Sequence, residues 1–250
     1  MEYSILDATN DFANLSNDIG RFKVKLCKDF KIPYSEEGVK VITPLDDFRF
    51  TTLDSIQQYL ISLMGFIRGF MELQNRIDDI TEFLRILDLG VTPEQMDGGN
   101  GKGLVYKFPI ESLAIMIHFQ IDSYFGQLCE LENDPKFGFC KRMTKVLENH
   151  PKKENYQNVL QCLADFRNSF HNGGVHSISK NKWIDNVEPK KGTIDKTFKS
   201  GEFKIEFKHD DEIIYNWKSI YLLIKESVKI LMDIIYEKSK DYKLKNGVHP

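Results

Sequence analysis

The longest hydrophobic pattern in this chain has the spacing of an α-helix. From residue 51 onward, apolar residues recur at steps of three and four positions, which places their side chains on one face of a helix. The series comprises Leu53, Ile56, Leu60, Leu63, Ile67 and Phe70, and it continues with Ile77, Ile80, Phe83, Leu84 and Leu87. The pattern predicts one long amphipathic helix over residues 51–87.

Four further segments show helical spacing. They cover residues 110–133, 137–149, 155–171 and 215–240. The first of these segments is apolar on most sides, which predicts a central helix surrounded by others. Pro109 precedes it and is expected in its first turn, where a proline costs no backbone hydrogen bond.

Other parts of the chain depart from the helical pattern. Residues 197–212 alternate between apolar and polar around Ser200-Gly201, which predicts a β-hairpin. The glycine-rich residues 96–108 predict a turn that leads into a short strand. In the first 50 residues, the segment 21–32 is compatible with either a strand or a short helix. The sequence therefore predicts a mainly α protein, a helical bundle with a small β-hairpin inserted before the last helix.

The composition is that of an ordinary globular protein. Of 250 residues, 41% are apolar and 28% are charged, and the formal net charge is −3, so nucleic acid would have to bind through a local patch. Four widely spaced cysteines form no CxxC pair. The N-terminus lacks a secretory pattern, and the apolar residues 59–73 are too short for a membrane span and contain Arg68. We expect a soluble, cytoplasmic protein with no cofactor and no membrane partner.

The stretch FRNSFHNGGVH at residues 166–176 combines residue types that carry chemistry. Arg167 and His171 are four positions apart, so they share one side of the predicted helix, at the border of its apolar stripe. A guanidinium can grip a phosphate, and a nearby positive charge favours the neutral imidazole that accepts a proton. A helix end explains the same residues, because Gly173 is a natural cap and a histidine suits the last turn. The spacing alone leaves both interpretations open.

The same stretch resembles the signature of the HEPN superfamily (higher eukaryotes and prokaryotes nucleotide-binding domains), whose members are small helical bundles. Arg167, Asn168 and His171 match the signature by residue type and order, and a glycine after the His-Asn pair is common in prokaryotic versions. Three residues separate Arg167 from His171, fewer than is usual in the family. The resemblance implies a HEPN-like helical domain over residues 51–250. The mixed pattern of residues 1–50 predicts an N-terminal extension that packs on this domain.

The resemblance also implies metal-independent cleavage of RNA, in a cleft that two HEPN domains of a homodimer form together. The ribose 2′-hydroxyl would attack the adjacent phosphate and leave a 2′,3′-cyclic phosphate end. His171 would act as acid and base, Arg167 would hold the phosphate, and Asn168 would orient one of them. Such proteins often serve as toxins or in antiviral defence, which implies an antitoxin or regulatory protein as a further partner. Other members are catalytically silent binding or scaffold modules, and that alternative stays open.

Further polar residues are candidates for a supporting role. Glu111, His118 and Asp122 share one face of the predicted central helix and could form a second polar layer behind the Arg-His pair. A solvent-facing strip is the simpler interpretation, and the spacing is too weak to predict a bound metal, although a metal-dependent hydrolase is a third hypothesis. Asn172 and His176 follow the pair directly and are candidates beside it, His176 more simply as a loop histidine.

Overall fold

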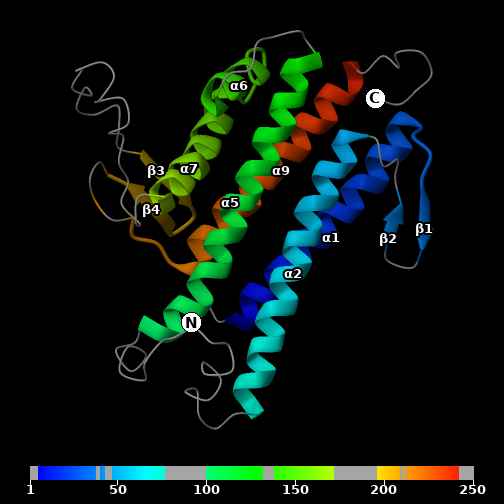
Figure 1. Ribbon diagram of the computed structural model, residues 1–250. Coiled ribbons are helices and arrows are strands. Elements are labelled where there is room, and N and C mark those ends of the chain that lie inside the picture. The colour runs from blue at the N-terminus through cyan, green and yellow to red at the C-terminus, as the bar shows by residue number, and fades with distance from the viewer. Residues whose placement is uncertain are drawn as a thin grey trace.

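The protein is described by a computed structural model that covers residues 5–37, 40–42, 47–76, 100–131, 138–171, 196–208, 211 and 213–241. These residues form six α-helices and two antiparallel two-stranded sheets (Figure 1). The helices are α1 (Ile5–Phe30), α2 (Phe48–Arg76), α5 (Asn100–Leu131), α6 (Phe139–Val146), α7 (Lys153–His171) and α9 (Trp217–Asp241). The strands are β1 (Ser35–Glu37), β2 (Lys40–Ile42), β3 (Lys196–Ser200) and β4 (Phe203–Phe207). The predicted mainly α class with a hairpin before the last helix is confirmed.

Helix α1 belongs to the hydrophobic core. It packs against α2 and α9. The segment 21–32, for which the sequence allows either a strand or a short helix, forms the end of this long helix as far as Phe30, and Ile32 lies just beyond it. Its apolar positions follow the three-and-four spacing of a helix, and the following four are fully or almost fully buried: Phe12, Leu15, Ile19 and Leu26. The first part of the chain therefore supplies one wall of the bundle.

Helix α2 begins with a buried cap. Asp47 precedes the helix, and its Oδ1 accepts a hydrogen bond from the backbone N–H of Arg49 at 3.0 Å, which satisfies one of the free donors at a helix start. The same carboxylate pairs with the Arg49 guanidinium, which also donates to Ser239 Oγ of α9 at 3.0 Å. The predicted helix is confirmed as far as Arg76, and the second apolar series at 77–87 lies outside the described residues.

Helix α5 runs through the middle of the bundle and contacts α2, α6, α7 and α9 (Figure 1). It begins at Asn100, so the predicted strand after the glycine-rich turn is wrong, and Pro109 lies inside the helix instead of in its first turn. Glycines and an internal proline each cost about 1 to 3 kcal/mol in a helix, so cooperative extension of the long helix outweighs this local preference.

The predicted hairpin forms beside α7 and α9. Its strands β3 and β4 pair antiparallel, with Phe198 opposite Ile205, and Gly201 in the turn has a φ of 60° that favours glycine. The alternation in this segment predicts that Phe203, Ile205 and Phe207 share one face, and of these Ile205 and Phe207 are buried and Phe203 is half-buried. The last predicted helix is confirmed as α9, and the apolar residues that recur along it at helical spacing are all fully buried: Ile220, Ile224, Val228, Leu231 and Ile235.

The second sheet was not predicted from the sequence. Strands β1 and β2 form a short antiparallel pair that lies beside α1 at the edge of the bundle (Figure 1). Their three-residue length gives too few alternating positions for a strand signal. Among the helices that the structure describes, none combines the length and the apolar character needed to cross a membrane.

Candidate functional site

Helix α7 carries the predicted Arg-His pair in its C-terminal half. Four of the five residues of the apolar stripe predicted for this helix are buried, and the fifth, Phe170, is half-buried; the buried ones are Val159, Cys162, Leu163 and Phe166. Arg167 is half-buried at the border of the stripe, and Asn168 beside it is exposed. His171 is the last residue of the helix, one turn beyond Arg167, so the two positions lie on the same side of α7.

The opposite flank of α7 is tied to the hairpin. Asp165 is 8% exposed, and its Oδ2 lies 3.0 Å from Lys196 Nζ on β3. Its other oxygen accepts a hydrogen bond of 3.1 Å from Gln161 Nε2. Asp165 therefore fixes the hairpin to the helix and has its oxygens engaged away from Arg167.

The guanidinium of Arg167 is positioned without a carboxylate. Its Nη1 donates a hydrogen bond of 2.9 Å to Oδ1 of Asn168, and its central carbon lies 5.3 Å from the ring centroid of Phe119 on α5. Its Nε is buried and has no hydrogen-bond partner among the described residues, and no carboxylate of that part of the chain pairs with it. The described surroundings therefore leave a positive charge uncompensated at the surface between α5 and α7, which suits an anionic ligand.

His118 of α5 lies close enough to Arg167 to be affected by its charge. The imidazole is 5% exposed and its centroid is 4.5 Å from that of the Phe139 ring. Burial lowers the pKa of His118 to about 4; the charge of Asp122 opposes this shift, and Arg167 and Arg142 add to it. His118 is consequently neutral at neutral pH, and its buried Nδ1 has no hydrogen-bond partner among the described residues.

One turn along α5 from His118, Asp122 holds an arginine of α6. Arg142 Nε donates to Asp122 Oδ1 at 2.9 Å, and its Nη2 contacts the same oxygen. Both side chains are about one-fifth exposed, so the pair reaches the surface next to His118. The structure thus places two guanidinium groups, those of Arg142 and Arg167, close enough to one buried histidine for both charges to act on it.

The predicted face of Glu111, His118 and Asp122 does exist on α5, but it is not a solvent-facing strip. Glu111 is 8% exposed and His118 5%, because α6 and α7 pack against this helix and Phe139 covers the imidazole. Among the described residues, no three acidic, histidine or cysteine side chains gather closely enough to hold a metal ion. These three residues therefore do not form the site that a metal-dependent hydrolase would need.

Some predicted site residues lie outside the described part of the chain, and the structure adds two site residues that the sequence did not predict. Asn172 and His176 lie outside the described residues. The sequence did not predict Phe119 as a site residue, because an exposed phenylalanine cannot be told from a buried one within an apolar helix. Arg142 could be found only as part of a basic stretch, since its partner Asp122 is 20 positions away.

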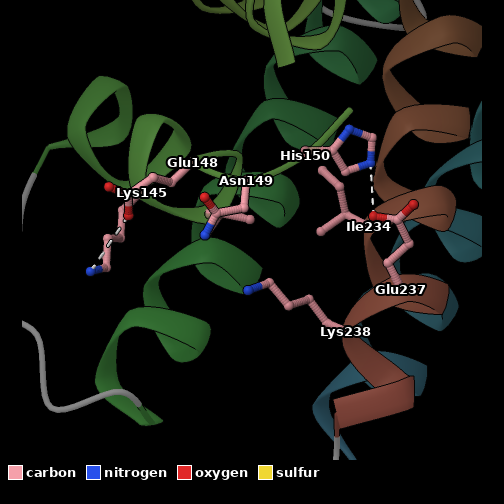
Figure 2. A pocket seen from close by; sticks show the side chains of 8 residues that line it. Lys145, Glu148, Asn149, His150, Ile234, Glu237 and Lys238 are labelled. Carbon is pink, nitrogen blue, oxygen red and sulfur yellow. Dashed lines mark ion pairs between the residues drawn. The ribbon is translucent and has the colours of Figure 1, made fainter. Parts of the chain in front are cut away.

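A cavity of about 330 Å³ lies at the other end of α7, between the turn after α6 and the end of α9 (Figure 2). Figure 2 shows the imidazole of His150 directed at Glu237, with Nε2 3.0 Å from a carboxylate oxygen. His150 Nδ1 accepts a hydrogen bond of 3.1 Å from the backbone N–H of Lys152. Both ring nitrogens thus face groups of the protein itself, which makes His150 a structural residue instead of a ligand-binding one.

A larger groove of about 690 Å³ lies between α1, α7 and α9. Lys25 and Lys240 each hold their ammonium group over the ring of Tyr236, at 4.8 and 5.3 Å from its centroid. Tyr156 on the same wall donates a short hydrogen bond to Asp233. Since four lysines and three carboxylates line this groove, its lining does not select a ligand by charge.

Comparison with protein-family models, with curated proteins and with solved structures finds no match to this chain. What the site can do follows from its own groups. They are a half-buried guanidinium without a described carboxylate partner, an imidazole kept neutral by burial, a second arginine held by Asp122, and an exposed phenylalanine ring. This set fits a phosphate-bearing ligand better than a cation or an apolar molecule.

Proposed function

We propose that this protein is a HEPN-like, metal-independent endoribonuclease whose site is built on Arg167 and His171 of α7. The resemblance of FRNSFHNGGVH to the HEPN signature and the helical fold around it both favour this function. Asn168, which accepts a hydrogen bond from Arg167, would hold the guanidinium in place.

The proposal rests mainly on the interaction partners of the Arg167 side chain. An arginine with a purely structural role at a helix border is expected to pair with a carboxylate, as Arg49 does with Asp47. Arg167 instead contacts an amide and an aromatic ring, and it has no carboxylate partner among the described residues. A guanidinium kept in this state retains its positive charge for a phosphate, and its Nη2 makes no hydrogen bond with the described residues.

The proposed reaction needs only groups of the protein and the RNA. The ribose 2′-hydroxyl oxygen attacks the adjacent phosphorus, and its proton passes to a neutral imidazole of His171. The bond from phosphorus to the 5′ oxygen breaks, and this oxygen takes up a proton from an imidazolium. In a homodimer, His171 of one copy accepts the first proton and His171 of the other copy donates the second. Arg167 stabilises the negative charge that develops on the phosphate oxygens.

The biological setting forms part of the same proposal. A ribonuclease that needs no metal is active wherever it meets RNA, so a cell that makes it needs a means of restraint. We therefore place this protein among toxins or antiviral defence effectors, with an antitoxin or regulatory protein as its partner. The resemblance to HEPN proteins supports this placement.

The proposal is tested by incubating purified protein with a panel of single-stranded RNAs in excess EDTA. The wild type is expected to yield fragments with 2′,3′-cyclic phosphate and 5′-hydroxyl ends. The Arg167→Ala/His171→Ala double variant is expected to yield none. Arg167→Lys separates charge from geometry, because lysine keeps the charge but loses the planar fork, and it should retain only a small part of the activity.

A matched control variant shows whether a difference in cleavage comes from the site itself, and not from a contaminating nuclease or from the loss of any surface arginine. Arg68 is an exposed arginine on α2, so Arg68→Ala removes the same group away from the site and should cut RNA like the wild type. If the folded double variant cuts as fast as the wild type, Arg167 and His171 are not the active site. If neither the wild type nor Arg68→Ala cuts any RNA of the panel, the proposed reaction is wrong.

A second candidate function is that of a non-catalytic binding or scaffold module. One observation favours it: an apolar groove of about 300 Å³ runs between α2 and α5, and Phe66 and Met116 in its lining are 48% and 42% exposed. Exposed apolar side chains of this size commonly mark interaction sites. Absence of cleavage, together with capture of a partner that Phe66→Ser or Met116→Ser abolishes, would support this function over the first.

A further inference from the structure

The surface beside Arg167 contains an exposed aromatic ring. Phe119 is 45% exposed, although it belongs to the central helix α5, whose neighbouring side chain His118 is buried. The Arg167 guanidinium lies over the Phe119 ring at 5.3 Å from its centroid, and the His118 ring meets it edge-on at 6.1 Å. These contacts fix the position of the ring while leaving nearly half of its surface open to a ligand.

The charge around this ring is positive. Arg167 lacks a described carboxylate partner, whereas the nearest carboxylate on α5, Asp122, is engaged by Arg142. His118 contributes no charge at neutral pH, because burial keeps its pKa low. An exposed apolar ring would suit an apolar partner, but a ring beside a guanidinium that has no described carboxylate partner suits a ligand that carries both a flat apolar group and an anion.

An unpaired nucleotide has this combination. Its base stacks on aromatic side chains, and its phosphate is held by arginine; single-stranded nucleic acids are bound in this way irrespective of sequence. A base within a duplex is stacked on its neighbours and cannot reach such a ring. A site that combines an exposed ring with a guanidinium would therefore favour single-stranded over double-stranded RNA.

We propose that Phe119 is a base-stacking residue of the Arg167 site and that the site accepts unpaired RNA. The inference rests on the proposed ribonuclease function and deepens it, because it names a substrate-binding residue and the kind of RNA that is bound. The base stacks on the open part of the Phe119 ring, and the phosphate next to it meets the guanidinium of Arg167.

The test measures binding separately from cleavage. A fluorescently labelled RNA with 2′-O-methyl groups at every position cannot be cut by attack of the 2′-hydroxyl, so its fluorescence anisotropy reports affinity alone. The wild type should bind the single strand more tightly than the same strand in a duplex. Phe119→Ala should weaken binding of the single strand by roughly tenfold or more, the usual effect of losing one stacked base.

Two further variants sharpen the result. Phe119→Trp retains a ring and should bind like the wild type, and quenching of its tryptophan fluorescence by the RNA would report the stacking directly. Ile61 is 53% exposed and belongs to α2, whereas Phe119 and Arg167 belong to α5 and α7, so Ile61→Ala is a matched control that should leave affinity unchanged. Circular dichroism confirms that each variant is folded.

The outcomes separate the two proposals. If unmodified RNA is cut but Phe119→Ala binds and cuts like the wild type, the stacking role is wrong and the ribonuclease stands. If the uncleavable strand binds through Phe119 but unmodified RNA is never cut, the stacking role stands and the ribonuclease is wrong. If Phe119→Ala changes the sedimentation coefficient but not RNA affinity, the ring belongs to a protein interface and the stacking role is overturned.

Discussion

Burial of His118 beneath Phe139 lowers the pKa of its imidazole to about 4, and this makes stability depend on pH. The unfolded chain has an ordinary histidine pKa, so between pH 6.5 and 4 it binds a proton that the folded state does not bind. The free energy of unfolding should therefore be highest above pH 6.5 and fall as the pH is lowered toward 4. The contribution of His118 to this slope is about 1 kcal/mol per pH unit.

Urea unfolding of the wild type and of His118→Phe at several pH values between 7 and 4 measures this effect. Phenylalanine keeps an aromatic ring against Phe139 and removes the buried nitrogen that has no described partner. Because other histidines and carboxylates titrate in the same range, the informative quantity is the difference between the two proteins. Parallel stability curves for the two proteins would contradict the burial of a neutral His118.

Asp47 and Arg49 form an ion pair that is almost fully removed from water, with side chains 0% and 3% exposed. Replacing Asp47 with alanine would leave the Arg49 charge buried and would also remove the cap of α2. We expect Asp47→Ala to lower the free energy of unfolding by about 3 kcal/mol or more. Denaturant unfolding at neutral pH measures the change.

Asp18 provides a comparison for this prediction. It also pairs with an arginine, Arg21, but the two side chains are 43% and 74% exposed. Asp18→Ala should therefore change stability by less than about 1 kcal/mol. Equal effects of Asp18→Ala and Asp47→Ala would show that burial does not govern the strength of these pairs.

At the scale of elements, two glycines in α2 weaken the helix without serving its packing. The GxxxG spacing of Gly65 and Gly69 is compatible with a close helix contact, but a Cβ atom at either position would have no described atom within 4 Å. Because alanine reduces the conformational entropy of the unfolded chain and favours the helix, Gly65→Ala and Gly69→Ala should each stabilise the protein by about 1 kcal/mol. Thermal unfolding followed by circular dichroism measures the gain.

Gly201 is the matching negative control for the glycine prediction. Its φ of 60° in the hairpin turn is unfavourable for a side chain, so Gly201→Ala should destabilise the protein although a Cβ would meet no described atom there. If Gly65→Ala or Gly69→Ala destabilised the protein, the exposed face of α2 would have to contact a group outside the described residues.

At the scale of the whole molecule, α1 completes the bundle. Its buried side chains, such as Phe12 and Ile19, face α2 and α9, and ion pairs of Lys23 with Asp54 and of Asp11 with Lys218 join it to both helices. A chain of residues 47–250 alone would expose the apolar faces that these side chains cover. We expect this truncated protein to lack a cooperative unfolding transition.

Circular dichroism melting and sedimentation of the truncated protein, beside Phe12→Ala in the full chain, check this expectation. Phe12→Ala should still unfold cooperatively, with a loss of about 3 to 5 kcal/mol. A truncated protein that melts cooperatively, close to the full chain, would show instead that residues 1–46 are a dispensable extension.

The sequence by itself determined the five described helices from α2 onward and where the hairpin turns, whereas it left the segment that forms the end of α1 open between strand and helix. The spacing of Leu53 to Ile67, the alternation around Gly201 and the apolar stripe of α9 are local patterns, and a helix or hairpin depends on neighbours a few residues away. For the same reason, the position of Arg167 and His171 on one side of α7 followed from their spacing alone. The glycine-rich start of α5 was mispredicted, because there the extension of a long packed helix outweighs local preference.

Only the tertiary structure decided what surrounds Arg167. Phe119, His118 and Arg142 are between 20 and 50 positions away in the chain, and nothing local to α7 selects them. The burial of His118, the pairing of Asp122 with Arg142 and the exposure of Phe119 all depend on how α5, α6 and α7 pack. Contacts between distant segments arise from the packing of whole helix faces, so residue spacing determines the elements of this protein and their packing determines its site.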